Sequence, residues 1–76
     1  MNFKRNISII GGAGHVGFPL GLVLSSKGFK VSLIDKDKTN IKKINNGQIP
    51  FLEENSEKLL NSMIKKKMIH ATDQLN

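Results

Sequence analysis

A glycine-rich turn between two apolar segments is the feature that most constrains this chain of 76 residues. Residues 6–10 are dense in β-branched apolar side chains, which is typical of a parallel strand buried on both faces. Residues 12–17 (Gly-Ala-Gly-His-Val-Gly) follow, and residues 29–34 then alternate in polarity before they reach Asp35. The pattern predicts a strand, a tight turn, a helix and a second strand, in that order.

The three glycines of the turn suit a phosphate-binding loop. Gly12 would permit the turn, Gly14 would let the backbone approach a pyrophosphate, and Gly17 would let the helix lie close to the sheet. The pyrophosphate would meet free N–H groups at the positive end of the helix dipole. Asp35, about 20 residues further on, could accept hydrogen bonds from both hydroxyls of the adenosine ribose. An ordinary βαβ unit would explain Gly12 and Gly17 but leaves Gly14 and Asp35 unexplained, so the pattern predicts a nicotinamide-dinucleotide site.

The expected cofactor-binding residues lie in the turn or at the end of the second strand: Gly12, Ala13, Gly14, His15, Val16, Gly17, Asp35 and Lys36. The carboxylate of Asp35 would repel a 2′-phosphate, which favours NAD over NADP, and Lys36 and Lys38 weaken this preference without reversing it. FAD proteins use the same kind of turn, so the residues alone leave FAD open. We expect His15 to contact the cofactor through its backbone N–H and not to act in catalysis. No catalytic residue and no metal site is predicted.

The apolar residues between the two predicted strands have the spacing of a helix. The first helix carries Pro19 in its first turn, where a missing N–H costs little, and should end at a left-handed Gly28. Apolar residues at helical spacing are expected to face the sheet: Val16, Leu20, Val23 and Leu24.

Two more helices and one more strand are predicted downstream. The second helix should begin after the N-cap Asp37 and end at Gly47, the third helix should cover residues 53–67, and the third strand residues 68–72. Residues expected to face inward from these helices are Ile41, Ile44, Leu59, Leu60, Met63 and Ile64. Right-handed crossovers then give β-α-β-α-α-β with strand order 3-2-1, an α/β fold that is the N-terminal half of a Rossmann-type parallel sheet. This arrangement leaves the first strand with an open edge, which favours self-association.

Residues 9–22 resemble the N-terminus of the UDP-glucose/GDP-mannose dehydrogenase family. These nucleotide-sugar dehydrogenases, which include enzymes that oxidise UDP-N-acetylmannosamine, usually begin with Gly-Leu-Gly-Tyr-Val-Gly, an apolar residue and Pro. The resemblance continues through residues 34–37, 44–53 and 72–73, and so covers essentially the whole chain. His15 replaces the commoner Tyr, and neither the glycines nor the acid at the end of the second strand is altered.

The resemblance implies a role in oxidising the C6 alcohol of a UDP- or GDP-sugar to the carboxylate with NAD. In the family, this chemistry depends on a cysteine, a lysine and an asparagine well downstream of the matched region, and this sequence has no cysteine. We therefore expect residues 1–76 to form a partial dinucleotide-binding domain that lacks the catalytic and sugar-nucleotide domains. The nucleotide sugar would be a substrate of the full-length parent only. Two alternatives stay open: part of another dehydrogenase, such as a hydroxy-acid dehydrogenase, or a non-catalytic nucleotide-binding or interaction module.

The net charge of +6 raises the question of nucleic-acid binding. The basic residues do not form one stripe, because Lys4, Arg5, Lys27 and Lys30 lie toward one end of the sequence and residues 65–67 at a helix end. There is no Trp or Tyr, and the four Phe residues are not interleaved with the basic ones. We expect a solvated basic surface and no nucleic-acid partner. No apolar run is long enough to span a bilayer, so a cytoplasmic protein without a membrane partner is expected.

Overall fold

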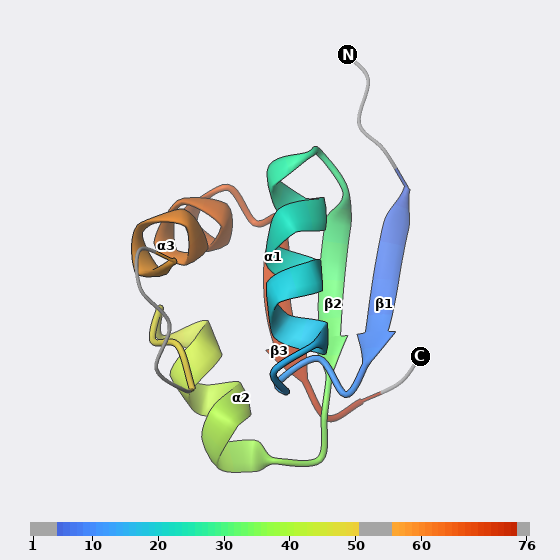
Figure 1. The fold of residues 1–76 in the computed structure, drawn as a ribbon, viewed down its shortest axis with the longest axis vertical. Helices are drawn as coiled ribbons and strands as arrows, with labels where there is room; N and C mark the ends of the chain where they lie inside the picture. The colour runs from blue at the N-terminus through green and yellow to red at the C-terminus, as the bar shows by residue number, and fades with distance from the viewer. Residues whose placement is uncertain (1–4, 51–55, 75–76) are drawn as a thin grey trace.

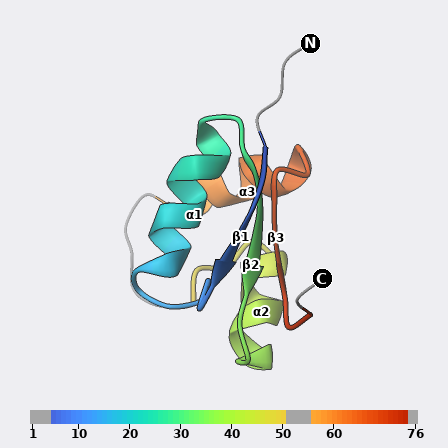
Figure 2. The same ribbon diagram turned by 90° about the vertical axis from the view of Figure 1, so that its right-hand side faces the viewer.

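The structure, a computed structural model, describes residues 5–50 and 56–74. Three parallel strands form one sheet with order β1-β2-β3, and the three helices lie on one of its faces (Figures 1 and 2). The elements are β1 (Asn6–Ile10), α1 (Gly17–Ser26), β2 (Lys30–Ile34), α2 (Lys38–Asn45), α3 (Glu57–Lys65) and β3 (Ile69–Thr72). The predicted α/β fold, order of elements and 3-2-1 strand order are confirmed.

The core lies between the sheet and the three helices. Its buried residues are Ala13, Phe18, Leu22, Val31, Leu33, Ile44, Leu60, Met63, Ile69 and Ala71. Some residues that were predicted to face inward are half-buried at the margin of this core: Leu24, Ile41, Leu59 and Ile64. The helical spacing in α2 and α3 therefore predicted the inward faces of both helices correctly.

The composition of β1 predicted that the strand is buried on both faces, and this prediction is wrong. Asn6, Ser8 and Ile10 are exposed, whereas Ile7 and Ile9, which alternate with them, are partly buried. The reason is topological. Successive right-handed crossovers in one direction place every helix on the same face of the sheet, so within the described chain the other face stays uncovered.

The prediction of which side of α1 faces the sheet is also wrong. The exposed fraction is 81% for Val16 and 50% for both Leu20 and Val23. The buried residues of α1 are Phe18, Gly21, Leu22 and Ser25. A Cβ at Gly21 would lie 2.5 Å from Cδ2 of Leu33, so the helix backbone rests directly on the sheet at this position. Apolar periodicity gives no weight to glycine and so misplaces the contact.

The helix ends follow local chemistry. Gly28 has φ +101°, as expected for a left-handed residue after α1. Asp37 caps α2, and its carboxylate accepts a hydrogen bond from the N–H of Asn40 at 3.1 Å. Gly47, at φ +81°, follows α2. The bounds predicted for the third helix, residues 53–67, are wrong: Ser56 precedes α3, which begins at Glu57 and ends at Lys65, and residues 51–55 lie outside the described residues.

Candidate functional site

The glycine turn leaves β1 at the carboxyl end of the sheet and is anchored to β2. The N–H groups of Gly11 and Gly12 both donate to the carbonyl of Ile34, at 2.7 and 3.1 Å. The left-handed residue is Gly11, with φ +75°, and not Gly12. Gly12 is needed for a different reason, because a Cβ there would lie 2.6 Å from Cβ of Leu33. The expected role of Gly12 in permitting the turn is therefore corrected to close packing on β2.

The other two glycines of the turn differ in their surroundings. A Cβ at Gly17 would lie 2.5 Å from the carbonyl oxygen of Gly11, so Gly17 brings the start of α1 against the turn, whereas Gly21 provides the approach to the strands. The N–H of Gly14 donates to the same Gly11 carbonyl at 3.1 Å. A Cβ at Gly14 would meet only that oxygen, at 3.3 Å, so its missing side chain leaves open space beside the turn.

Asp35 links the end of β2 to the turn. One carboxylate oxygen accepts the N–H of Ala13, and the other accepts the N–H of Asp37, both at 3.0 Å. These hydrogen bonds lower the pKa of the Asp35 carboxyl below its ordinary value, and the bond from Asp37 has a larger effect than the bond from Ala13. Burial acts in the opposite direction and raises the pKa. A carboxylate can accept further hydrogen bonds at its remaining lone pairs, so Asp35 keeps acceptor capacity beside the turn.

The lowered pKa of Asp35 makes the stability of the fold depend on pH. The ionised carboxylate stabilises the folded state fully above the unfolded-state pKa of about 3.9, and this contribution is lost as the pH falls through the lower folded-state pKa. Asp35→Asn is therefore expected to be less stable than wild type at neutral pH, by a margin that shrinks below about pH 4. Urea unfolding followed by circular dichroism at several pH values measures the margin. Asp73→Asn, which alters an exposed carboxylate, is the control, and a margin independent of pH would contradict the linkage.

The N-terminus of α1 provides free donors next to the turn. Within the described chain, the N–H groups of Val16 and Gly17 make no hydrogen bond, that of Phe18 donates to the carbonyl of Gly14 at 3.0 Å, and Pro19 has no N–H. The first turn of α1 contains no acidic residue that would neutralise the positive end of its dipole. An anion with several oxygens fits this arrangement.

The two remaining expected contact residues lie at the margin of the site. His15 is exposed on the turn, and Lys36 is exposed directly after Asp35. Lys38, which could have attracted a 2′-phosphate, lies 3.8 Å from the carboxylate of Asp73. The described structure thus brings residues 12–17 and 35–36 together at the carboxyl end of β1 and β2, where parallel sheets of this kind bind ligands.

The basic residues are arranged differently from what their separation in the sequence suggested. Several basic residues of the described chain lie shortly before a strand or at its first residue: Arg5, Lys27, Lys30, Lys65, Lys66 and Lys67. All parallel strands begin at the same end of the sheet, so these residues gather at its amino end, while Asp35, Asp37 and Asp73 lie at the carboxyl end. The amino end of the sheet is therefore basic, and the carboxyl end, which carries the site, has both these carboxylates and the lysines Lys36 and Lys38.

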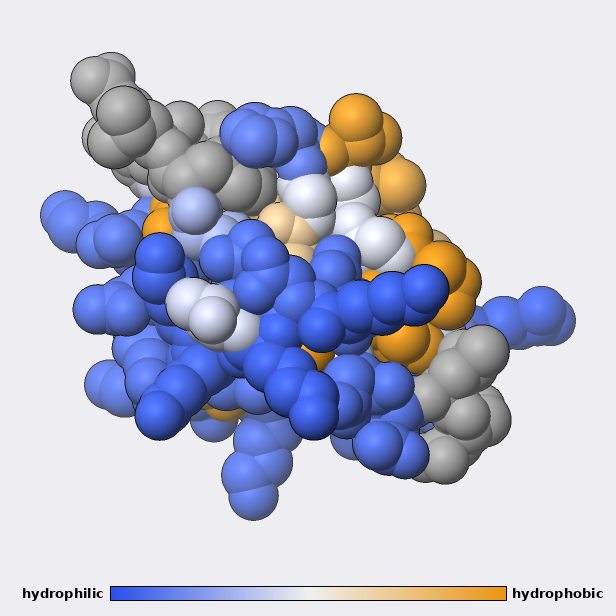
Figure 3. Space-filling view, turned by 90° about the horizontal axis from the view of Figure 1, so that it is seen from below, coloured by the Kyte–Doolittle hydropathy of each residue, from blue (hydrophilic) through white to orange (hydrophobic). Residues whose placement is uncertain are grey.

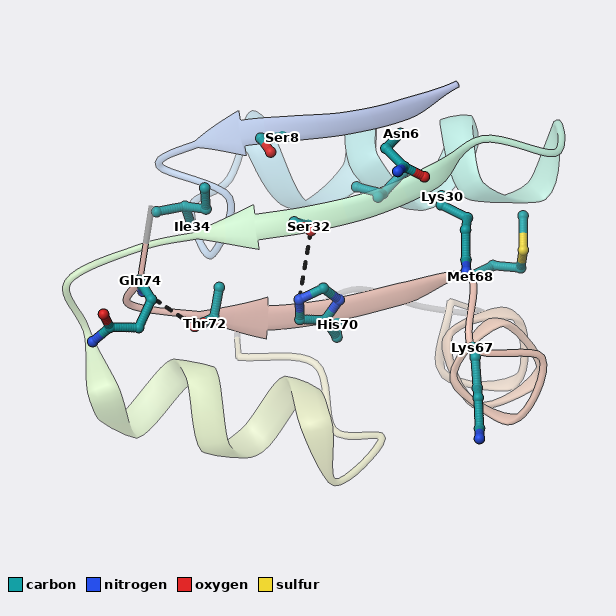
Figure 4. A pocket seen from close by; sticks show the side chains of 11 residues that line it. Asn6, Ser8, Lys30, Ser32, Ile34, Lys67, Met68, His70, Thr72 and Gln74 are labelled. Carbon is teal, nitrogen blue, oxygen red and sulfur yellow. Dashed lines mark hydrogen bonds between the residues drawn. The ribbon is translucent and has the colours of Figure 1, made fainter. Parts of the chain in front are cut away.

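The uncovered face of the sheet carries a polar hollow (Figure 4). Ser8, Ser32 and His70 line it from the three strands, and the Ser32 hydroxyl lies 3.5 Å from Nε2 of His70. Lys30 and Lys67 lie at the amino end of the hollow (Figure 4). Residues 5–50 and 56–74 contain no group of His, Cys, Asp and Glu that could hold a metal ion. No helix in the same residues is long and apolar enough to cross a bilayer.

A βαβ unit with a glycine turn, free N–H groups at a helix N-terminus and an acid at the end of β2 defines the class of dinucleotide-binding, Rossmann-type proteins. Residues 5–76 match the NAD-binding domain of the UDP-glucose/GDP-mannose dehydrogenase family. The chain belongs to this family, which confirms the resemblance noted in the sequence.

Three relatives show the extent of the similarity. A UDP-glucose 6-dehydrogenase of Rhizobium meliloti is 34% identical over 64 residues, which are 84% of this chain and 15% of that protein. A GDP-mannose dehydrogenase from Pseudomonas aeruginosa, solved as a ternary complex, is 34% identical with a TM-score of 0.84, over 90% of this chain and 15% of that one. A UDP-D-ManNAc dehydrogenase from Pyrococcus horikoshii is 28% identical with a TM-score of 0.84, over 91% of this chain and 16% of that one. The chain thus spans about a sixth of the length of each relative.

Proposed function

We propose that this chain binds NAD at the carboxyl end of β1 and β2. The observation that carries the proposal is the hydrogen bond of 3.0 Å between Asp35 and the N–H of Ala13, which holds an acid against the glycine turn across 22 residues of sequence. A ribose held by the carboxylate would then have its phosphate beside the turn. The family match supports NAD as the ligand.

Each proposed contact follows from the geometry of the site. The free N–H groups of Val16 and Gly17 would donate to the diphosphate, and the space beside Gly14 lets the diphosphate approach the backbone. Gly12 and Ala13 would hold the turn in shape, and His15 would contact the cofactor through its backbone N–H. Asp35 would accept hydrogen bonds from the ribose hydroxyls and repel a 2′-phosphate, so NAD is favoured over NADP, with Lys36 beside it.

We also propose the reaction of the full-length parent protein. The family match and the 34% identical relatives support oxidation of the C6 alcohol of a nucleotide sugar to the carboxylate, with NAD as the acceptor of hydride and a UDP- or GDP-sugar as the substrate. This chain would hold the cofactor, and it has no cysteine to act as a covalent nucleophile. We therefore propose that the chain alone does not catalyse this oxidation.

Calorimetric titration with NAD tests the proposed site. Wild-type protein is expected to bind NAD saturably, and more tightly than NADP. Asp35→Ala is expected to bind NAD about tenfold to hundredfold more weakly, because hydrogen bonds to a charged acceptor are lost. Glu57→Ala removes an exposed carboxylate of α3, outside the turn, and should leave the affinity unchanged. Unchanged affinity in a folded Asp35→Ala protein would contradict the site, and a folded wild type that does not bind NAD would indicate an interaction module.

A further inference from the structure

We propose that Asn45, at the end of α2, positions the carboxylate of Asp35 for cofactor binding by fixing α2 to β3. This role rests on the proposed function, in which Asp35 binds the ribose of NAD. Asn45 acts through the backbone of β3 and through α2, and so it is a positioning residue. The contacts involved lie between α2, β2 and β3, on the side of β2 away from β1, so a further strand beside β1 would leave them in place.

The side-chain amide of Asn45 makes two hydrogen bonds with one residue of β3. Nδ2 of Asn45 donates to the carbonyl oxygen of Ala71, and Oδ1 accepts the N–H of Ala71, both at 2.8 Å. A side-chain amide carries the same donor and acceptor as a backbone peptide, so Asn45 takes the place of a neighbouring strand at the outer edge of β3. Both hydrogen bonds are partly buried, so their loss would leave two backbone groups of Ala71 without a partner.

These hydrogen bonds close a ring of contacts that includes Asp35. At the start of α2, the N–H of the N-cap Asp37 donates to the Asp35 carboxylate at 3.0 Å. At the end of α2, Asn45 holds Ala71, and the next residue, Thr72, accepts the N–H of Asp35 at 3.1 Å. Both ends of α2 are therefore fixed to residues that hold Asp35, whose second carboxylate oxygen bonds the glycine turn.

Apolar packing gives α2 little support of its own. The helix has eight residues, and Ile44 is its buried residue. Figure 3 looks onto the carboxyl end of the sheet, where hydrophilic residues make up most of the surface. The ion pair between Lys38 and Asp73 near the start of α2 is 3.8 Å long, and Lys38 is largely exposed, so this pair contributes little. The position of α2 therefore depends strongly on the two hydrogen bonds of Asn45.

Loss of the Asn45 hydrogen bonds would release the end of α2 from β3. The helix could then turn as a unit about its first residues, and the N–H of Asp37 would move away from the Asp35 carboxylate. A ribose would meet a carboxylate that is no longer held in one orientation. Binding would weaken, because groups that are fixed before the ligand arrives lose less conformational freedom on binding.

NMR titration of the Asp35 carboxyl tests this role without any cofactor. Asn45→Asp keeps the size of the side chain but replaces the donor Nδ2 by a carboxylate oxygen, which repels the carbonyl of Ala71. The pKa of Asp35 is expected to rise toward its ordinary value, because the hydrogen bond from Asp37 is the largest cause of its lowered pKa. Asn46→Asp is the matched control, because it adds the same charge at the exposed C-cap of α2 and should change the pKa less. Circular dichroism establishes that both variants are folded.

Two results of this titration would overturn the proposal. One is a wild-type Asp35 pKa in folded Asn45→Asp, and the other is an equal rise in both variants, which would reflect the added charge alone. A side chain that only stabilises the fold would lower the free energy of unfolding and leave the pKa of Asp35 in folded molecules unchanged.

Calorimetric titration with NAD measures the consequence for binding. Asn45→Asp is expected to bind NAD about threefold to tenfold more weakly than wild type, and Asn46→Asp to bind it as wild type does. The loss should be smaller than in Asp35→Ala, because the carboxylate is still present. Equal affinities of wild type and Asn45→Asp would overturn the role of Asn45 alone, whereas a wild type that does not bind NAD would contradict the proposed function.

Hydrogen exchange of the wild type provides the test if Asn45→Asp does not fold. A contact that strengthens NAD binding must itself be strengthened by NAD, because the coupling is reciprocal. Saturating NAD is therefore expected to slow exchange of the Ala71 N–H about threefold to tenfold. The N–H of Lys66, which donates to Ser62 at the end of α3, is the control and should exchange as before. Bound NAD without slower exchange at Ala71 would overturn the proposal.

Discussion

Gly12→Ala is expected to destabilise the fold by about 3 kcal/mol, at the upper end of the usual cost of overpacking. The added Cβ would lie 2.6 Å from Cβ and 2.7 Å from Cα of Leu33. Neither atom can rotate away, so the turn and β2 would have to separate, and the hydrogen bond from Gly12 to Ile34 would be strained as well. A chain of this size has little stability in reserve, so the variant should be largely unfolded at room temperature. Urea unfolding followed by far-UV circular dichroism measures the effect.

Gly14→Ala is the matched control for this destabilisation. It adds the same methyl group two residues further along the same turn, where the new Cβ would meet only the carbonyl oxygen of Gly11 at 3.3 Å. We expect its stability to lie within about 1 kcal/mol of wild type, as is usual for a substitution with small steric consequences. Equal stabilities of the two variants would show that the turn does not pack on β2 at Gly12 as described.

The same Gly14→Ala protein is expected to lose NAD affinity although it remains folded. The methyl group would occupy the space through which the proposed diphosphate approaches the backbone, next to the free N–H groups of Val16 and Gly17. A loss of about tenfold to hundredfold is expected, since several hydrogen bonds to a charged ligand would lengthen together. Calorimetric titration with NAD measures the loss, and Ser26→Ala on the surface of α1 is the control. Wild-type affinity in Gly14→Ala would place the diphosphate elsewhere.

Most of the secondary structure could be predicted because it follows from local chemistry. The N-cap of Asp37, the left-handed Gly28 and the spacing of Ile44, Leu60 and Met63 all act over a few residues, and the structure confirms each. The same holds for the order of the strands, which follows from the handedness of crossover connections. The place of Asp35 beside the turn was predictable too, because strands that are parallel and adjacent end together.

The packing of α1 could not be predicted from its apolar residues. Val16, Leu20 and Val23 have the spacing of a buried face, yet they are exposed, because Gly21 allows the helix backbone itself to rest on the sheet. The different structural roles of Gly11 and Gly12 were not predicted, for a related reason. A glycine required by backbone dihedral angles and a glycine required by a neighbour look the same in a sequence, and only coordinates reveal Leu33 beside Gly12.

The sequence by itself determined the helices and strands, their order in the sheet and the presence of a glycine turn with an acid at the end of the next strand. These features depend on backbone geometry and on residues close together in the chain. The tertiary structure decided which side of α1 is buried, which face of the sheet is uncovered within the described chain, and where the charges gather. Arg5 and Lys67 lie far apart in the sequence but share the amino end of the sheet, because parallel strands must all begin there.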